Sequence, residues 1–101
     1  MSEFLPETVT GTVATNEVVT VETNYLLGGM QHVFRFANGR GASVLCHGGS
    51  YGGKDGLWEI AVLKADGDLD YSTPITSDVL GWLDVPEVES TLRAIMALPP
   101  V

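Results

Sequence analysis

The dipeptide Asn38-Gly39 constrains the fold of this chain more than any other feature of its sequence. It stands between two strand-like runs within residues 31–47, and in that setting an Asn-Gly pair favours a two-residue type I′ hairpin turn. The register of such a turn places Val33 opposite Val44. One face then carries Phe34, Phe36 and Leu45, and the other carries Val33, Ala42, Val44 and Cys46. Because both faces are partly apolar, we predict that this hairpin is central in its sheet.

Two further stretches have the composition of strands. Residues 17–23 are rich in β-branched side chains, which favour a strand. Residues 57–75 alternate as a second hairpin with a two-residue turn near Asp66-Gly67. The predicted packed face holds Trp58, Ile60, Val62, Leu69, Tyr71 and Ile75. The predicted solvent face holds Glu59, Ala61, Asp68, Asp70 and Ser72.

The C-terminal part of the chain predicts one amphipathic helix. Asp84 is suited to be its N-cap and Glu87 completes a capping box, while Pro99-Pro100 forbids continuation. Before it, Thr76 and Ser77 are suited to cap one helical turn over residues 78–80. The sequence therefore predicts a single α+β domain over residues 1–101, with residues 1–10 as a loosely ordered arm. Its architecture is an antiparallel β-meander of four to five strands with the helix packed on one face.

The charge of the chain limits its partners. Thirteen acidic residues stand against five scattered basic ones, for a net charge of −8. This argues against direct binding to nucleic acid or to an anionic membrane. With one cysteine, no signal-peptide pattern and no apolar run of about 20 residues, the sequence predicts a cytoplasmic protein. The acidity fits either plain solubility or a negative face that meets a basic partner.

Three motifs resemble catalytic or metal-binding signatures, and each is incomplete. Residues 48–55 nearly match a phosphate-binding loop, but Asp55 replaces the required hydroxyl and a strand follows instead of a helix. The acidic triplet in residues 66–70 begins like a calcium loop, but Tyr71 stands where glycine is required. His32, Cys46 and His47 are too few for zinc; we expect a buried or half-buried cysteine and two ordinary surface histidines. We therefore predict no catalytic residue, no metal site and no cofactor.

The predicted contact surface is the acidic side of the second hairpin. Neighbouring residues on one face of a strand lie about 6.6 Å apart, close to the roughly 7 Å between successive phosphates. The predicted partner-binding residues are Glu59, Asp66, Asp68 and Asp70, with Tyr51 of the adjacent glycine-rich loop. A merely solvated face is the alternative. Trp82 is expected in the core, with an exposed binding anchor as the alternative.

Two segments resemble a family of small uncharacterised bacteriophage and prophage proteins. They are Tyr-Gly-Gly-Lys-Asp-Gly-Leu-Trp-Glu-Ile-Ala-Val-Leu at 51–63 and Thr-Pro-Ile-Thr-Ser-Asp-Val-Leu-Gly-Trp-Leu at 73–83. The hairpin at 34–44 is similar to what precedes them there, so the resemblance covers roughly residues 31–98. It implies an accessory protein acting in the host cytoplasm. Small acidic phage proteins of this sort include inhibitors of host defence, among them anti-CRISPR proteins and DNA mimics.

Two functions follow as hypotheses. The first is a non-enzymatic phage protein that inhibits a host nucleic-acid-handling or defence protein by occluding its basic surface. The alternative is a phage structural or assembly protein that acts through self-association, so a homo-oligomer is possible. An exposed sheet edge or an apolar patch around Trp82 would then be the contact. A small enzyme would require a pocket with converging polar groups, for which the sequence offers no set of residues.

Overall fold

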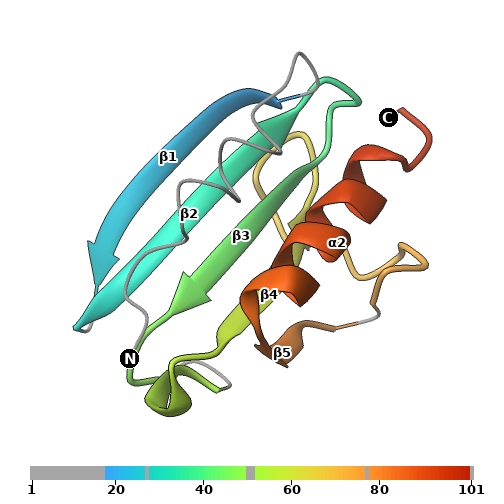
Figure 1. Cartoon of the computed structure of the whole chain (residues 1–101). Helices are drawn as coiled ribbons and strands as arrows, with labels where there is room; N and C mark the ends of the chain where they lie inside the picture. Colours follow the sequence, from blue (N-terminus) through green and yellow to red (C-terminus); the bar gives the residue numbers. More distant parts are fainter. Residues whose placement is uncertain (1–17, 27, 50–51, 77, 101) are drawn as a thin grey trace.

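A computed structural model describes residues 18–26, 28–49, 52–76 and 78–100; the predicted N-terminal arm and Tyr51 lie outside these ranges. The described chain forms a five-stranded antiparallel sheet in the order β1-β2-β3-β4-β5 (Figure 1). The strands are β1 (Val18–Leu26), β2 (Gly29–Phe36), β3 (Gly41–Cys46), β4 (Trp58–Leu63) and β5 (Leu80–Leu83). A 3₁₀ turn, η1 (Gly53–Asp55), precedes β4, and the helix α2 (Val85–Met96) follows β5. The predicted α+β meander with one C-terminal helix is confirmed.

The helix begins and packs as its sequence predicts. The Asp84 carboxylate accepts the backbone N–H of Glu87, whose side chain in turn accepts the N–H of Asp84. This capping box satisfies two donors that the first helical turn leaves free. The helix contacts β3, β4 and β5 across one face of the sheet (Figure 1). The core between them consists of Phe34, Phe36, Ala42, Val44, Cys46, Trp58, Ile60, Val62, Val88, Leu92 and Ile95.

The first hairpin exists, but its predicted register is wrong by one residue. The N–H of Phe36 donates to the carbonyl of Arg40 at 2.9 Å, and the N–H of Gly39 donates to the carbonyl of Phe36 at 3.0 Å. This is a three-residue loop in which only Gly39, at φ 85°, is left-handed. A shift of one residue exchanges the faces of a strand. Ala42 therefore lies opposite Phe34, and both face the core.

The second hairpin turn departs from its prediction in the same way. The N–H of Lys64 donates to the carbonyl of Asp68 at 2.7 Å, around another three-residue loop with left-handed Gly67. The shift turns Leu69 and Tyr71, predicted on the packed face, toward solvent. Both loops have the sequence Ala-Asx-Gly. Both registers differ from the prediction for the same reason. In each loop glycine is the one left-handed residue, whereas the predicted type I′ turn needs two.

The fifth strand is not the one that the sequence predicts. Beyond the turn, residues 68–75 keep a single bridge, between Leu63 and Leu69. The outer neighbour of β4 is instead β5, in which Leu83 lies opposite Trp58. The predicted helical turn over residues 78–80 is wrong, since β5 begins at Leu80; Ser77, its predicted cap, lies outside the described residues.

His32 is buried, contrary to the prediction of a surface histidine. It lies on the core side of β2, accepts or donates a hydrogen bond of 3.0 Å with Thr23, and stacks at a tilt against Trp58 with ring centroids 5.8 Å apart. Burial lowers the pKa of His32 below its ordinary value of 6.5. The neutral imidazole is thus the form that the folded protein holds at neutral pH.

Candidate binding surface

The predicted acidic row does not form a continuous face. Asp66 and Asp68 are exposed at the second hairpin turn, where the Asp66 carboxylate accepts the backbone N–H of Asp68 at 2.9 Å. Glu59 lies near the other end of β4, half-buried and opposite Leu45. Tyr51 lies outside the described residues, so nothing places it beside these acids. Two of the five predicted residues therefore stand together at the surface.

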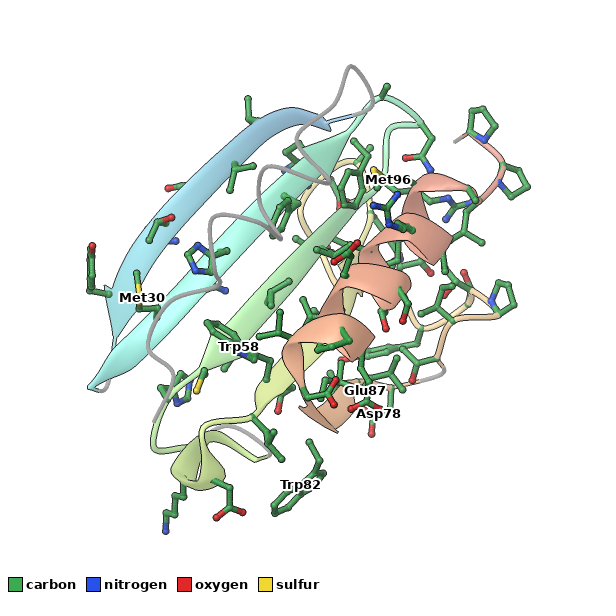
Figure 2. All side chains as sticks on the ribbon, in the orientation of Figure 1. Met30, Trp58, Asp78, Trp82, Glu87 and Met96 are labelled. Carbon is green, nitrogen blue, oxygen red and sulfur yellow. The ribbon has the colours of Figure 1, made fainter. Side chains whose placement is uncertain are left out.

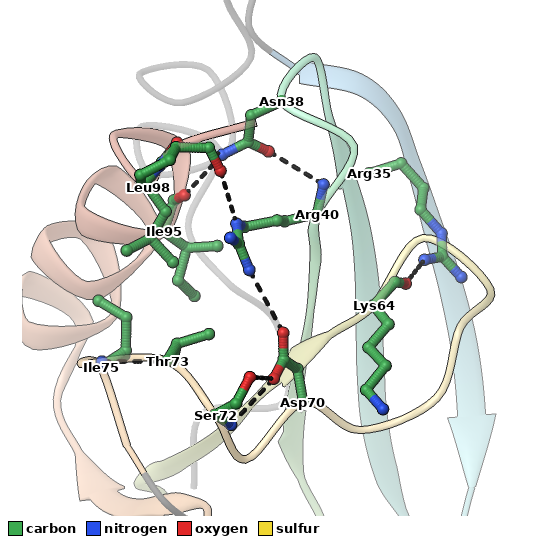
Figure 3. Close-up of polar contacts among 11 residues, drawn as sticks. Arg35, Asn38, Arg40, Lys64, Asp70, Ser72, Thr73, Ile75, Ile95 and Leu98 are labelled. Atoms are coloured by element: carbon green, nitrogen blue, oxygen red, sulfur yellow. Dashed lines mark hydrogen bonds and ion pairs between the residues drawn. The ribbon is translucent and has the colours of Figure 1, made fainter. Parts of the chain in front are cut away.

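Asp70 is not a surface residue, and its predicted display to solvent is wrong. Its backbone N–H donates to the carbonyl of Val62 at 2.8 Å, so it takes the core side of β4 after the register shift. Arg40 donates to the Asp70 carboxylate at 3.3 Å, and the Ser72 hydroxyl and N–H donate to the other oxygen (Figure 3). Arg40 also donates to the carbonyl of Pro99 at 3.0 Å. Asp70 thus ties the segment after β4 to the first hairpin, which in turn holds the C-terminal segment.

Asp70 should make the stability of the protein sensitive to acid. The hydrogen bonds from Ser72, together with the positive charge of Arg40, lower the pKa of Asp70 below its ordinary value of 3.8. A lowered folded pKa gives stability that is complete above about pH 3.8 and is lost as pH falls through the folded pKa. We expect Asp70→Asn to be less stable at neutral pH and to lose less stability in acid. Chemical denaturation across this pH range measures both effects.

A matched control separates Asp70 from the other acids of the same loop. Asp66→Asn removes one charge from the exposed turn and keeps the oxygen that accepts the Asp68 N–H. Its unfolding free energy should stay within about 0.5 kcal/mol of the wild type. An acid profile that Asp66→Asn changes as much as Asp70→Asn does would contradict the structural role of Asp70.

The three arginines make hydrogen bonds or ion pairs with other residues of the chain. Arg40 pairs with Asp70, and Arg93 pairs with Glu89 one helical turn away at 3.1 Å. The Arg35 guanidinium donates to the backbone carbonyl of Lys64 at 3.2 Å. The exposed lysines, Lys54 and Lys64, are the other two bases of the chain.

The acidic residues that the structure describes lie mostly in the half of the fold that follows β3. Among the described residues, those from 18 to 49 contain one acid, Glu22, and two arginines. Those from 52 to 100 contain nine acids and three bases. The acids of this acidic half, which comprises η1, β4, β5, α2 and their connections, are Asp55, Glu59, Asp66, Asp68, Asp70, Asp78, Asp84, Glu87 and Glu89. Only Asp70 among them is buried.

Trp82 is more exposed than Tyr71, the other exposed aromatic side chain described in the acidic half, and its predicted place in the core is wrong. It is 59% exposed and projects from β5 at the end of the molecule where Asp78 and Glu87 also lie (Figure 2). Its φ of 61° is the only positive value outside glycine among the described residues. Its backbone abuts Gly52, where an added Cβ would lie 2.9 Å from the Trp82 Cα. A strained backbone that holds a large apolar side chain in solvent is typical of a functional position.

Three further features of the described residues bear on function: a surface depression, metal binding and membrane crossing. A shallow, open depression of about 380 Å³ lies beside the second hairpin turn and is lined by Lys64, Ala65, Asp66 and Asp70. Within the described ranges, no three His, Cys, Asp or Glu side chains are grouped so as to hold a metal ion. In the same ranges, no helix has the length and apolar character needed to cross a bilayer.

Comparisons with models of known protein families, with curated proteins and with solved structures find no match to this chain. The resemblance to small phage proteins therefore stays a prediction.

Proposed function

We propose that this chain is a non-enzymatic, acidic binding protein of phage type that inhibits a host nucleic-acid-handling or defence protein. It acts in the host cytoplasm by occluding a basic surface of that protein. The observation that carries the proposal is the charge asymmetry of the fold. Nine acids and three bases occupy the acidic half, while arginines elsewhere are engaged with backbone carbonyls or with Asp70. Such a field attracts a basic partner and repels nucleic acid.

The contact we propose differs from the predicted row of carboxylates. Asp70 is not part of the proposed contact, because its carboxylate forms an ion pair with Arg40. Asp66 and Asp68 remain as exposed charges at the turn after Leu63, at one end of β4. Trp82 precedes Leu83, which lies opposite Trp58 at the other end of β4, and supplies apolar area that carboxylates alone lack. Tryptophan is among the residues that most often anchor interfaces, and its face also attracts arginine and lysine side chains. The proposed surface thus extends along β4 within the acidic half, with exposed acids at one end and an aromatic anchor at the other.

Quantitative capture from a bacterial host lysate tests this proposal. We expect the immobilised wild-type protein to enrich a basic-surfaced protein that elutes as salt is raised. Asp66→Lys with Asp68→Lys should weaken capture about tenfold or more, because both charges are exposed within the proposed contact. Trp82→Gly should do the same, and glycine adopts the φ of 61° without strain.

The control is Glu22→Lys, which reverses one exposed charge on β1, outside the acidic half. Capture by this variant should stay within about twofold of the wild type, since the change is remote from the contact. Capture that is insensitive to salt, or that Glu22→Lys weakens as much as Asp66→Lys alone, would show that the acidic half is not the contact.

A structural or assembly role through self-association is the second candidate. The observation that favours it is the outer edge of β1, which pairs with no other strand in the described part of the chain and lies at the far side of the sheet from the acidic half.

A further inference from the structure

Among the residues that the structure describes, no strand pairs with the outer edge of β1. β1 is nine residues long and is the first strand in the sheet order, so β2 pairs with one of its sides. Its register with β2 is irregular between Val18 and Thr20 and regular from there to Leu26. Natural edge strands are usually protected by lysine, proline or a bulge in mid-strand. Residues 20–26 contain none of these and carry one charge, Glu22.

Two of the exposed side chains of β1 are large and apolar. Val21 is 41% exposed and Tyr25 is 74% exposed. They lie opposite Phe34 and Met30 of β2, and cross-strand partners share a face, so both are on the side of the sheet that bears α2. The helix contacts β3, β4 and β5, so it does not cover β1.

We infer that β1 pairs antiparallel with β1 of a second copy of this chain across a two-fold axis. An axis of this kind places the same surface on both sides, so the strand must be complementary to itself. Centring the pair on Thr23 places Val21 opposite the other copy's Tyr25, and Glu22 opposite its Asn24. Aromatic–β-branched pairs stabilise antiparallel strands, and this register repeats that pair on both sides of the axis.

The neighbouring registers are less favourable. Centring on Glu22 would place two carboxylates directly opposite each other, which is destabilising. Centring on Asn24 would place Tyr25 opposite threonine instead of valine. In an antiparallel pair, two facing residues either both direct their backbone N–H and C=O groups toward the other strand or both direct them away. Two copies of one strand can therefore shift only so that another single residue lies on the axis, and Glu22 and Asn24 are the adjacent choices. The side chains of β1 thus favour the register with Thr23 on the two-fold axis.

The charge distribution permits this contact although the chain is acidic overall. The described residues from 18 to 49 hold one acid and two arginines, and the acidic half lies beyond β3. As far as the described residues go, two copies joined at β1 therefore meet through their less acidic parts and keep their acidic halves apart. Since two strand edges bury less area than a standard interface, we expect a dimer that dissociates in the micromolar range.

Disulfide trapping tests both the dimer and its register. Thr23→Cys places two thiols across the axis at the Cα separation of about 4.5–5.5 Å that facing strand residues have, which a disulfide spans. We expect this variant to form a covalent dimer on mild oxidation. Glu22→Cys and Thr20→Cys face other residue types in this register and should crosslink several-fold less. The native Cys46 is buried and does not compete.

Light scattering after size exclusion provides the second measurement. The wild type should show a concentration-dependent dimer, and Thr23→Lys, which brings two ammonium groups together, should be monomeric up to about 100 µM. A wild type that is monomeric at that concentration, or equal crosslinking at all three cysteine positions, would overturn the inference. Capture of a basic partner by Thr23→Lys should be unchanged, so this result is separable from the proposed function.

Discussion

Gly29→Ala should destabilise this protein by about 3 kcal/mol or more, because the strand neighbour leaves no space for a methyl group. A Cβ added at Gly29 would overlap the carbonyl oxygen of Cys46 and lie 2.7 Å from the Cα of His47. Both atoms belong to the backbone, so no side-chain rotation relieves the clash. β2 and β3 would have to separate at this end of the sheet. Chemical denaturation followed by the fluorescence of buried Trp58 measures the loss.

The neighbouring Gly28 provides the control. It has a φ of 77°, and a Cβ added there would have no atom within 4 Å, so its replacement meets open space. Gly28→Ala should cost about 1 kcal/mol, which is the strain of a left-handed alanine. Equal denaturation midpoints for the two variants would show that β2 and β3 are not as close at Gly29 as the structure places them.

The hairpins show how far local sequence predicts this fold. Asn38-Gly39 and Asp66-Gly67 correctly indicate two turns, because glycine adopts a positive φ with little strain and is strongly favoured in turns that need one. They do not distinguish a two-residue loop from a three-residue loop, because both types accept an Asx-Gly pair. The difference of one residue decides which side chains face the core. The meander and helix could therefore be predicted, while the membership of each face could not.

Asp70 shows the consequence for the predicted binding residues. A strand pattern of alternating acids indicates a solvent face only if the register is known. Here the partners of Asp70, which are Arg40 and Ser72, include an arginine thirty residues away. The exposure of Trp82 could not be predicted from the sequence for a related reason. Its exposure follows from the irregular pairing of β5 with β4 and from the close approach of Gly52, and both are tertiary features.

Asn38 has a second role that its turn sequence does not reveal. Its side-chain amide donates to the carbonyls of Ile95, Met96 and Leu98, at 2.9, 3.3 and 3.2 Å, at the C-terminus of α2 (Figure 3). Its side-chain oxygen accepts the N–H of Arg40 at 3.0 Å. The final carbonyls of a helix have no partner within the helix and carry partial negative charge. One amide thus both closes the first hairpin and fastens the helix end to it.

Asn38→Asp isolates that second role. The carboxylate keeps the shape of the side chain and the bond from the Arg40 N–H, but it has no hydrogen to donate and places a negative charge against three carbonyl oxygens. We expect a loss of about 2–3 kcal/mol at neutral pH, with a smaller loss for Asn38→Ala, which adds no charge. Thermal and chemical denaturation of the two variants measure this order.

The pH dependence of Asn38→Asp shows whether the new carboxylate causes its instability. Carbonyl oxygens around the new carboxyl raise its pKa in the folded state above the ordinary value of about 3.9. The penalty is therefore complete above that raised pKa and shrinks as pH falls through it, because the protonated acid regains a hydrogen to donate. Relative to wild type, the variant should recover stability in acid, the direction opposite to the loss expected from Asp70. A penalty that is constant with pH would place the side chain of Asn38 away from the helix end.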